Sequence, residues 1–372
     1  MTRTRPHLVL ALLGLTMLAA VGCVGMSKPE GWAGPACRDA DTNCVSSEGV
    51  ADDLVLASTD KGELSALKVE DFSKVWTFPT GEEDPKIELE AIYGTAVIMD
   101  DTVYLGAYSG DVYALGLKDG DVRWRFEADG PIIAGLAASE KAVYVASDEG
   151  SLYALDPKDG SEKKRFEAGD SIWAAPRLAD GVLYVASVNG KLYALDAETL
   201  DSVWDAPFEA DQGLISDPVL AGGTVLVGGF DRTLHTVDAD TGKEGWSFKT
   251  DNWFWGRPLV ANGTVYAPNL DGRLYALDAE TGERSWSFEA EEPLRSAPVI
   301  AGEVLLIVDR GGNVYGLDAE AGTLKWSAAA ALEKTVLSNP LVLGEEVLVS
   351  AQGGDLFRVD ATAGGFVEVA TP

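Results

Sequence analysis

A single motif recurs about every 40 residues along most of this sequence. It reads approximately Gly-x-Leu-Tyr-Ala-Leu-Asp, with glycine, tryptophan and phenylalanine following at fixed distances, and its clearest copy runs from Gly272 to Phe288. The positions equivalent to Asp278 are spaced by 48, 40, 40, 42, 40, 40 and 42 residues, and they are Lys68, Gly116, Asp156, Asp196, Asp238, Asp278, Asp318 and Asp360. A repeat of about 40 residues is the length of one four-stranded propeller blade. We therefore predict an all-β fold, an eight-bladed β-propeller of four-stranded antiparallel blades, with seven blades as the alternative.

Each repeat divides into four short apolar segments. In one copy these are Val299-Ile300, Val304 to Val308, Asn313 to Leu317 and Thr323 to Trp326. Asp278 and Gly282 are typical residues for the turn between the last two strands. The first copy has no obvious first strand before Leu54. Either part of Trp32 to Val50 or the C-terminal Phe366 to Ala370 must complete a blade, and spacing alone does not decide between them.

Six of the ten tryptophans occupy one position of the repeat. They are Trp76, Trp124, Trp204, Trp246, Trp286 and Trp326. A large flat ring at the same place in each outer strand is suited to packing between adjacent blades. We predict that these tryptophans are structural.

The Tyr-Ala-Leu-Asp-x-x-x-Gly-x-x-x-Trp motif resembles the repeat of pyrroloquinoline quinone (PQQ)-type propellers, and the tryptophans resemble the docking motif of that family. The resemblance covers residues 54 to 370, in register from copy to copy.

The N-terminus has the features of an export signal. Arg3 and Arg5 precede an apolar run, Leu8 to Val21, that is short for a membrane span. The run ends in Ala20-Val21-Gly22-Cys23, which resembles the lipobox of bacterial lipoproteins. This resemblance implies cleavage before Cys23 and diacylation of this residue. We expect a signal peptide over 1–22, a lipid-anchored tether over 23–52 and the propeller over 53–372.

The cysteine count is consistent with this organisation. With Cys23 acylated, Cys37 and Cys44 remain, separated by six residues. In an oxidising compartment they can close a small disulfide loop within the tether. The expected location is extracytoplasmic and membrane-anchored, either on the outer membrane facing the periplasm or on the outer face of the cytoplasmic membrane.

Lipobox, repeat and length together resemble the lipoproteins that assist outer-membrane assembly. That resemblance implies a ring-shaped scaffold that binds partners and catalyses no reaction. Quinone-dependent dehydrogenases share the repeat, but they carry a disulfide between adjacent cysteines, and this sequence has no Cys-Cys pair. A PQQ-dependent oxidoreductase and a cell-surface propeller that binds glycans or peptides are the alternatives.

The sequence offers no recognisable catalytic set. Its two histidines are His7, in the signal region, and His235, which stands at the usual tyrosine position of a repeat and is predicted to be a packed strand residue. We therefore expect no catalytic residue, no cofactor and no metal. The net charge of −31 disfavours nucleic acid as a ligand, because phosphate backbones are repelled. The expected partner of this monomeric propeller is another envelope protein or a peptide segment.

Partner binding is expected where a repeat departs from its consensus. The segments that lead into first strands carry small residues before a proline, but one copy reads Trp253-Phe254-Trp255-Gly-Arg257-Pro. Arg295 and Trp173 occupy similar segments of other copies, and aromatic and arginine side chains are favoured interface anchors. We predict a partner-binding surface on one rim, formed by Trp253, Phe254, Trp255, Arg257, Arg295 and Trp173. The alternative is that these rings fill gaps between blades and the arginines pair with carboxylates.

Overall fold

The computed structural model describes residues 54–58, 62–80, 87–328, 335–336, 338–352 and 355–370. The predicted signal peptide, the tether and Cys23, Cys37 and Cys44 lie outside the described residues. In the described part of the chain, every regular element is a strand, and no helix is long and apolar enough to cross a membrane.

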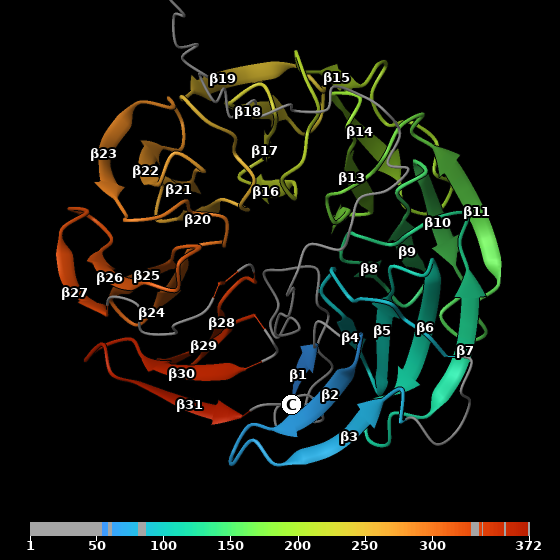
Figure 1. Ribbon diagram of the computed structural model, residues 1–372. Coiled ribbons are helices and arrows are strands. Elements are labelled where there is room, and N and C mark those ends of the chain that lie inside the picture. The colour runs from blue at the N-terminus through green and yellow to red at the C-terminus, as the bar shows by residue number, and fades with distance from the viewer. Residues whose placement is uncertain are drawn as a thin grey trace, which may run out of the picture.

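The strands form eight separate antiparallel sheets, the blades, arranged in a ring (Figure 1). Blade one contains β1 (Leu54–Ser58), β2 (Leu64–Lys68) and β3 (Lys74–Phe78). Blade two contains β4 (Val97–Met99), β5 (Thr102–Gly106), β6 (Asp111–Gly116) and β7 (Val122–Glu127). Blade three contains β8 (Ala137–Ala138), β9 (Val143–Ala146), β10 (Ser151–Leu155) and β11 (Glu162–Glu167). Blade four contains β12 (Arg177–Ala179), β13 (Val182–Ala186), β14 (Lys191–Asp196) and β15 (Phe208–Glu209).

The second half of the ring repeats this arrangement. Blade five contains β16 (Val219–Ala221), β17 (Thr224–Gly228), β18 (Thr233–Asp238) and β19 (Glu244–Lys249). Blade six contains β20 (Leu259–Ala261), β21 (Thr264–Pro268), β22 (Arg273–Asp278) and β23 (Arg284–Glu289). Blade seven contains β24 (Val299–Ala301), β25 (Val304–Val308), β26 (Val314–Asp318) and β27 (Leu324–Ala328). Blade eight contains β28 (Leu341–Leu343), β29 (Glu346–Ser350), β30 (Leu356–Asp360) and β31 (Phe366–Ala370).

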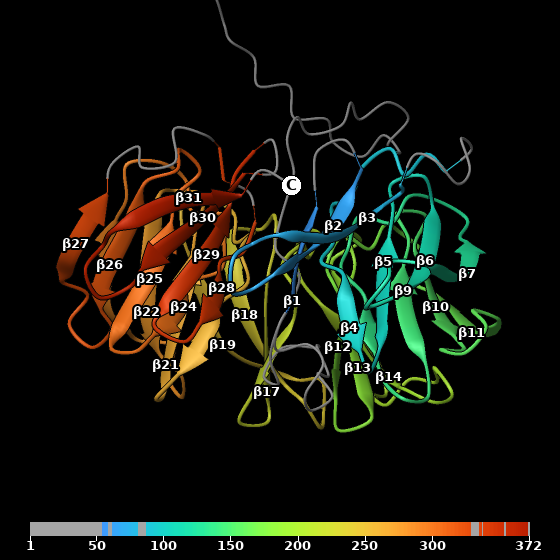
Figure 2. The ribbon, with the colours of Figure 1, turned by 90° about the horizontal axis from the view of Figure 1, so that it is seen from below.

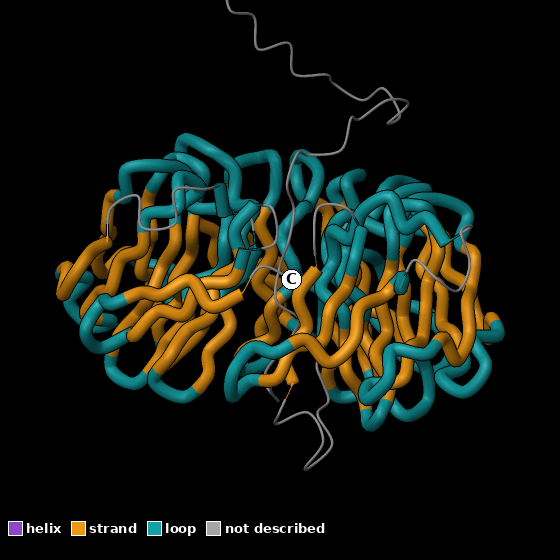
Figure 3. Tube along the Cα trace, turned by 60° about the horizontal axis from the view of Figure 1, so that its bottom comes forward, coloured by secondary structure: helices purple, strands orange, loops and turns teal. Residues whose placement is uncertain are grey.

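The eight-bladed prediction is confirmed. In each four-stranded blade the strands pair in chain order, with the first strand nearest the ring axis and the fourth on the outside (Figure 1). Seen edge-on, the ring is one blade thick, and turns cover both of its faces (Figures 2 and 3).

The structure shows the role of the C-terminal segment, one of the two segments that the spacing left as candidates for completing a blade. β31 pairs with β30, so the C-terminal segment is the outer strand of blade eight. β1 to β3 correspond to the second, third and fourth strands of the other blades. Among the described residues, blade one has three strands, and Trp32 to Val50, the other candidate segment, lies outside the described residues.

The apolar core lies between the blades. One cluster joins Tyr104 and Val112 of blade two to Val143 and Tyr153 of blade three, and similar clusters recur around the ring. The second and third strands of a blade, such as β5, β6 and β25, read as almost continuous apolar runs because neighbouring blades cover both of their faces, whereas outer strands such as β11 are largely exposed.

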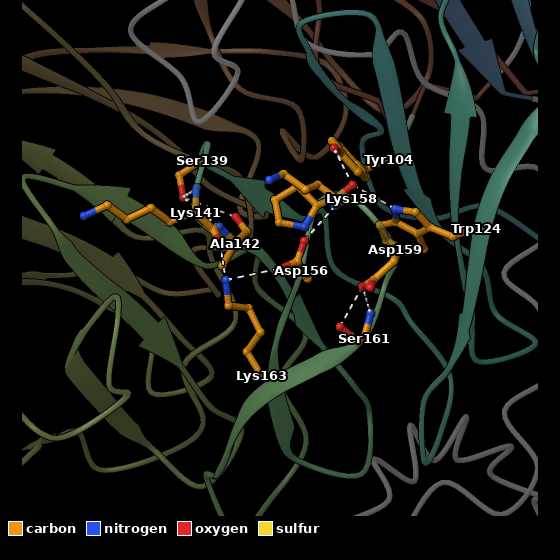
Figure 4. A network of polar contacts seen from close by, with 11 residues as sticks. Tyr104, Trp124, Ser139, Lys141, Ala142, Asp156, Lys158, Asp159, Ser161 and Lys163 are labelled. Carbon is orange, nitrogen blue, oxygen red and sulfur yellow. Dashed lines mark hydrogen bonds and ion pairs between the residues drawn. The ribbon is translucent and has the colours of Figure 1, made fainter.

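The tryptophans at the repeated position pack between adjacent blades, as predicted, whereas blade three has Lys164 there. In Figure 4, Trp124 lies beside the Asp156–Ser161 turn of blade three, and its Nε1 donates a hydrogen bond of 2.9 Å to the carbonyl of Pro157. The same bond, of 2.8 to 3.0 Å, joins Trp76 to Leu117, Trp204 to Ala239, Trp246 to Ala279 and Trp326 to Ala361. These rings, and that of Trp286, each lie against a glycine with positive φ in the next blade: Gly120, Gly160, Gly242, Gly282, Gly322 and Gly364.

Candidate partner-binding surface near the ring axis

In blades two to eight, whose leading segments the structure describes, the segment that leads into the blade is bound to a turn of the same blade. The N–H of Phe230, between β17 and β18, donates to the carbonyl of Gly213 at 2.8 Å. The corresponding bond from Leu270 to Trp253 in blade six is 3.1 Å. The incoming segments and these turns therefore share one face of the ring, which we call the incoming face.

Neighbouring side chains in an incoming segment alternate between core and surface. The residue four positions before the proline, or before its equivalent, is apolar and at most 2% exposed in seven blades: Ile92, Ile132, Ile172, Leu214, Phe254, Leu294 and Val336. The prediction that Phe254 contacts a partner is thus wrong. Its ring is 1% exposed and packs with Leu226, Leu234 and Tyr275 in the core between blades five and six.

The flanking tryptophans belong to a cluster of four rings from three blades. The aromatic cluster consists of Trp173 (blade four), Phe230 (blade five), and Trp253 and Trp255 (blade six). Phe230 packs edge-on against Trp253, with ring centroids 4.9 Å apart, and lies 6.1 Å from Trp173 and 6.3 Å from Trp255. The rings of Trp173 and Trp255 lie 6.4 Å apart at an interplanar angle of 29°. Blades four and six are not neighbours, so such a contact is possible only close to the ring axis.

Arg295 extends this cluster toward blade seven. Its guanidinium lies 4.4 Å from the centroid of the Trp255 ring, which is cation–π geometry. Burial, together with repulsion from the nearby Arg310, lowers the pKa of Arg295 to about 10. Arg295 and the four rings are all partly exposed, so the cluster is accessible from outside.

Arg257 occupies a different setting. It stands one residue before the proline, the position that Asp217 holds in blade five, and the two charges attract each other. Burial raises the pKa of Asp217 although a backbone hydrogen bond and Arg257 favour its charged form, and its Oδ1 accepts the N–H of Ala175 at 2.7 Å. The repeat position of Arg295 is shared by Trp255 and Trp173, three residues before the proline. The structure therefore links Arg295 to the aromatic cluster and Arg257 to Asp217.

Sequence reasoning missed two members of this region. Phe230 lies at the centre of the aromatic cluster, and Arg310 adds a second cation beside Arg295. Both occupy the turn between second and third strands, where other copies have Tyr108, Asp148, Val188 and Leu270. Asp148, in the equivalent turn of blade three, accepts the Nε1–H of Trp173 at 2.6 Å. The aromatic cluster is therefore also bound to blade three.

The surface combines exposed aromatic area with positive charge in a strongly acidic protein. Such a surface can bind an extended or acidic segment through ring contacts and charge-assisted hydrogen bonds. Within the described ranges, no three His, Cys, Asp or Glu side chains are grouped so that they could hold a metal ion.

A family model described as outer membrane protein assembly factor BamB matches residues 39–133, 111–217, 203–329 and 291–366. The chain belongs to the BamB family. Among curated relatives, BamB of Escherichia coli (strain K12) is 29% identical over 87 residues, which are 23% of this chain and 22% of the relative. BamB of Salmonella typhimurium (strain LT2) is 26% identical over 93 residues, 24% of each chain. The matched segments thus span under a quarter of these relatives.

Solved structures show the same fold over a much larger share of the chain. The crystal structure of BamB from Moraxella catarrhalis has a TM-score of 0.71 at 19% identity, covering 88% of this chain and 96% of that one. Quinohemoprotein alcohol dehydrogenase from Comamonas testosteroni has a TM-score of 0.68 at 15% identity, covering 91% of this chain and 75% of that one. At these identities the likeness shows the propeller fold alone.

Proposed function

We propose that this BamB-family propeller is a non-enzymatic scaffold outside the cytoplasm that binds another envelope protein through the aromatic cluster, Arg295 and Arg257. The family match over residues 39–366 is the observation that carries the proposal. The partly exposed rings of three blades, with a guanidinium stacked on Trp255, supply the binding surface.

The proposed mechanism is recognition without chemistry. Rings already packed against one another lose little conformational freedom on binding, so they suit the anchors of an interface. Arg295 is held over Trp255 and presents a cation to the partner. An acidic or extended partner segment would add hydrogen bonds to this guanidinium while its apolar side chains cover the rings. Acylation of Cys23 would keep the ring close to a membrane, where envelope partners are concentrated.

Site-specific photo-crosslinking in the cell envelope tests this surface. A crosslinking amino acid replaces Trp253 on the incoming face or, as the control, Asp240, an exposed residue in the turn between β18 and β19 on the opposite face. We expect a discrete crosslinked partner from position 253 that disappears when Trp255→Ala and Arg295→Ala are added. The melting temperature of the double variant should stay near that of the unchanged protein. Equal crosslinking from both faces would contradict the proposed surface.

The rival function is PQQ-dependent oxidation. It is tested by incubating the purified protein with PQQ and measuring binding and the reduction of a dye with alcohols or sugars. We expect neither stoichiometric binding nor dye reduction. Stoichiometric PQQ binding with substrate-dependent dye reduction would overturn the scaffold proposal.

A further inference from the structure

A second surface, away from the ring axis, departs from the repeat in its charge. It is an open groove of about 510 Å³ between the outer part of blade five and blade six. Four cations line it: Arg232, Lys249, Arg273 and Arg284. The rings of Phe248 and Tyr275, with centroids 5.2 Å apart, form part of its wall.

At the equivalent repeat positions, the other blades mostly carry residues that are not cations. The residue equivalent to Lys249 is a glutamate in four other outer strands: Glu127, Glu167, Glu209 and Glu289. Arg273 of blade six pairs in register with Glu289, and at its repeat position other copies have Asp111, Ser151, Lys191, Thr233, Asn313 and Asp355. Arg284 is matched by Lys74, Val122, Glu162, Glu244 and Leu324. Only in the groove between blades five and six, among those the structure describes, do all these positions carry a cation.

Arg232 is the most unusual of the four. Its equivalents in six other blades are glycines with φ between +77° and +90°: Gly62, Gly110, Gly150, Gly190, Gly272 and Gly312. Arg232 adopts φ +67°, a conformation that costs free energy for any residue with a side chain. A strained backbone at one copy, where glycine serves the others, indicates that this side chain has a role beyond the fold.

The four cations of the groove outnumber the three carboxylates that lie near it. Glu289 pairs with Arg273 at 3.1 Å, Asp271 accepts the Tyr275 hydroxyl at 2.6 Å, and Asp251 lines the groove. Within the described part of the chain, no ion pair engages the side chains of Arg232, Lys249 or Arg284.

We propose that this groove binds a phosphoryl group carried on a larger molecule. Arginine offers a planar fork of donors that matches phosphate oxygens, and three arginines with one lysine suit a multiply charged oxyanion better than a single carboxylate. The groove is larger than one phosphate ion, and its aromatic wall can contact the organic part of the ligand. The site is independent of the scaffold function, because no partner protein is needed to measure it.

Calorimetric titration of the purified full-length protein with inorganic phosphate tests the proposal. We expect saturable binding that weakens as sodium chloride is raised, because salt screens these exposed cations. Flotation of the unacylated Cys23→Ser protein with phosphatidylcholine vesicles, with and without phosphatidic acid, identifies the source of the phosphoryl group, because the acyl chains at Cys23 would otherwise hold the protein on both kinds of vesicle. Retention that depends on phosphatidic acid supports a lipid headgroup, whereas phosphate binding without vesicle retention supports a soluble phosphorylated ligand. The absence of saturable binding to either probe would overturn the site.

The repeat supplies a matched pair of variants. Arg273 and Lys191 occupy the same repeat position, each pairs with a glutamate of the neighbouring outer strand, and both side chains are 38% exposed. Arg273→Ala should weaken phosphate binding at least about tenfold, the loss of one charge-assisted hydrogen bond, while Lys191→Ala leaves it unchanged. Equal weakening by both variants would show a diffuse field effect and refute a specific groove.

Consensus substitutions separate binding from folding. Arg232→Gly and Lys249→Glu each restore the residue that most other blades carry, so the ring should fold and melt normally. We expect both to abolish measurable phosphate binding or to weaken it at least about tenfold. Unchanged phosphate binding in both variants would contradict the assignment of these two side chains.

Discussion

His235 stands where five other repeats have Tyr113, Tyr153, Tyr193, Tyr275 and Tyr315. It is 7% exposed in β18, which confirms the prediction of a packed strand residue. Its Nε2 lies 2.7 Å from Asp231 Oδ2 and its Nδ1 lies 2.8 Å from Glu244 Oε1. Burial alone would lower the pKa of His235, but the hydrogen bonds to the two carboxylates outweigh it and raise the pKa above 6.5.

This arrangement makes stability depend on pH. Because the folded-state pKa is raised, the protonated ring stabilises the fold fully below the unfolded pKa of about 6.5, and the contribution is lost as pH rises through the folded pKa. Urea unfolding at about pH 5.5 and about pH 8.5 should show a decrease in the free energy of unfolding with rising pH. His235→Tyr, the residue of other repeats, should remove that part of the decrease. Tyr275 already bonds to Asp271, the equivalent of Asp231, so the variant has a precedent in this fold. An identical pH profile in the variant would contradict the role of His235.

Individual residues also show which assignments could be made from the sequence and which could not. The six repeated tryptophans could be assigned because a position filled by one large ring in most copies has one function in all of them. Phe254 was misassigned because Trp253-Phe254-Trp255 was taken as one exposed unit. Counting back from the proline places Phe254 with Ile172, Leu214 and Leu294, which are all buried. The role of Phe230 could not be predicted, because the residue at its position, in the turn between second and third strands, differs from copy to copy.

At the scale of single elements, the turn between the third and fourth strands is what each docking tryptophan contacts. Gly282 has φ +72°, and a Cβ added there would lie 2.6 Å from Cδ2 of Trp246. The residue at this position must therefore lack a side chain as well as adopt a left-handed backbone conformation. The glycine lets the strands reverse, and it admits the ring of the neighbouring blade.

The two requirements can be separated by substitution. Gly263, in the turn between β20 and β21, has φ +76°, and a Cβ there would meet nothing within 4 Å. Gly263→Ala should lower the free energy of unfolding by about 1–2 kcal/mol, the cost of the left-handed conformation alone. Gly282→Ala should lose a further ~1–3 kcal/mol because Trp246 must move. Equal losses in urea denaturation would mean that the tryptophan contact carries no energy.

Element boundaries were accessible from sequence because each blade uses the same turns. The segments predicted in one copy match β24, β25, β26 and β27 to within two residues. An inner strand for blade one could not be predicted, because spacing alone did not decide between Trp32 to Val50 and the C-terminal segment. The proposed partner-binding surface could be predicted from sequence only as a region, because distances between rings of different blades depend on the radius of the ring.

At the scale of the whole molecule, an acidic ring is proposed to be held at a membrane by lipid. The net charge of −31 opposes adsorption to anionic headgroups, so attachment should depend on the acyl chains at Cys23. Cys23→Ser should shift the protein from the membrane fraction to the soluble extracytoplasmic fraction, as measured by fractionation and immunoblotting. Cys37→Ser is the control and should remain in the membrane fraction. Retention of the Cys23→Ser protein in membranes would contradict the lipobox.

The seam between blades one and eight has a consequence for the order of folding. Val55 and Leu67 pack there against Leu341, Leu348 and Leu356, from opposite ends of the described chain. Every strand pairing in the described residues lies within one blade, so each pairing joins residues of a single repeat of about 40 residues. The seam alone must close a loop of nearly the whole domain, and the entropy of that closure makes it the slowest contact to form. If the chain is exported as proposed, the apolar face of blade one stays exposed until blade eight has left the export channel, and chaperones of the envelope should bind that face during this interval.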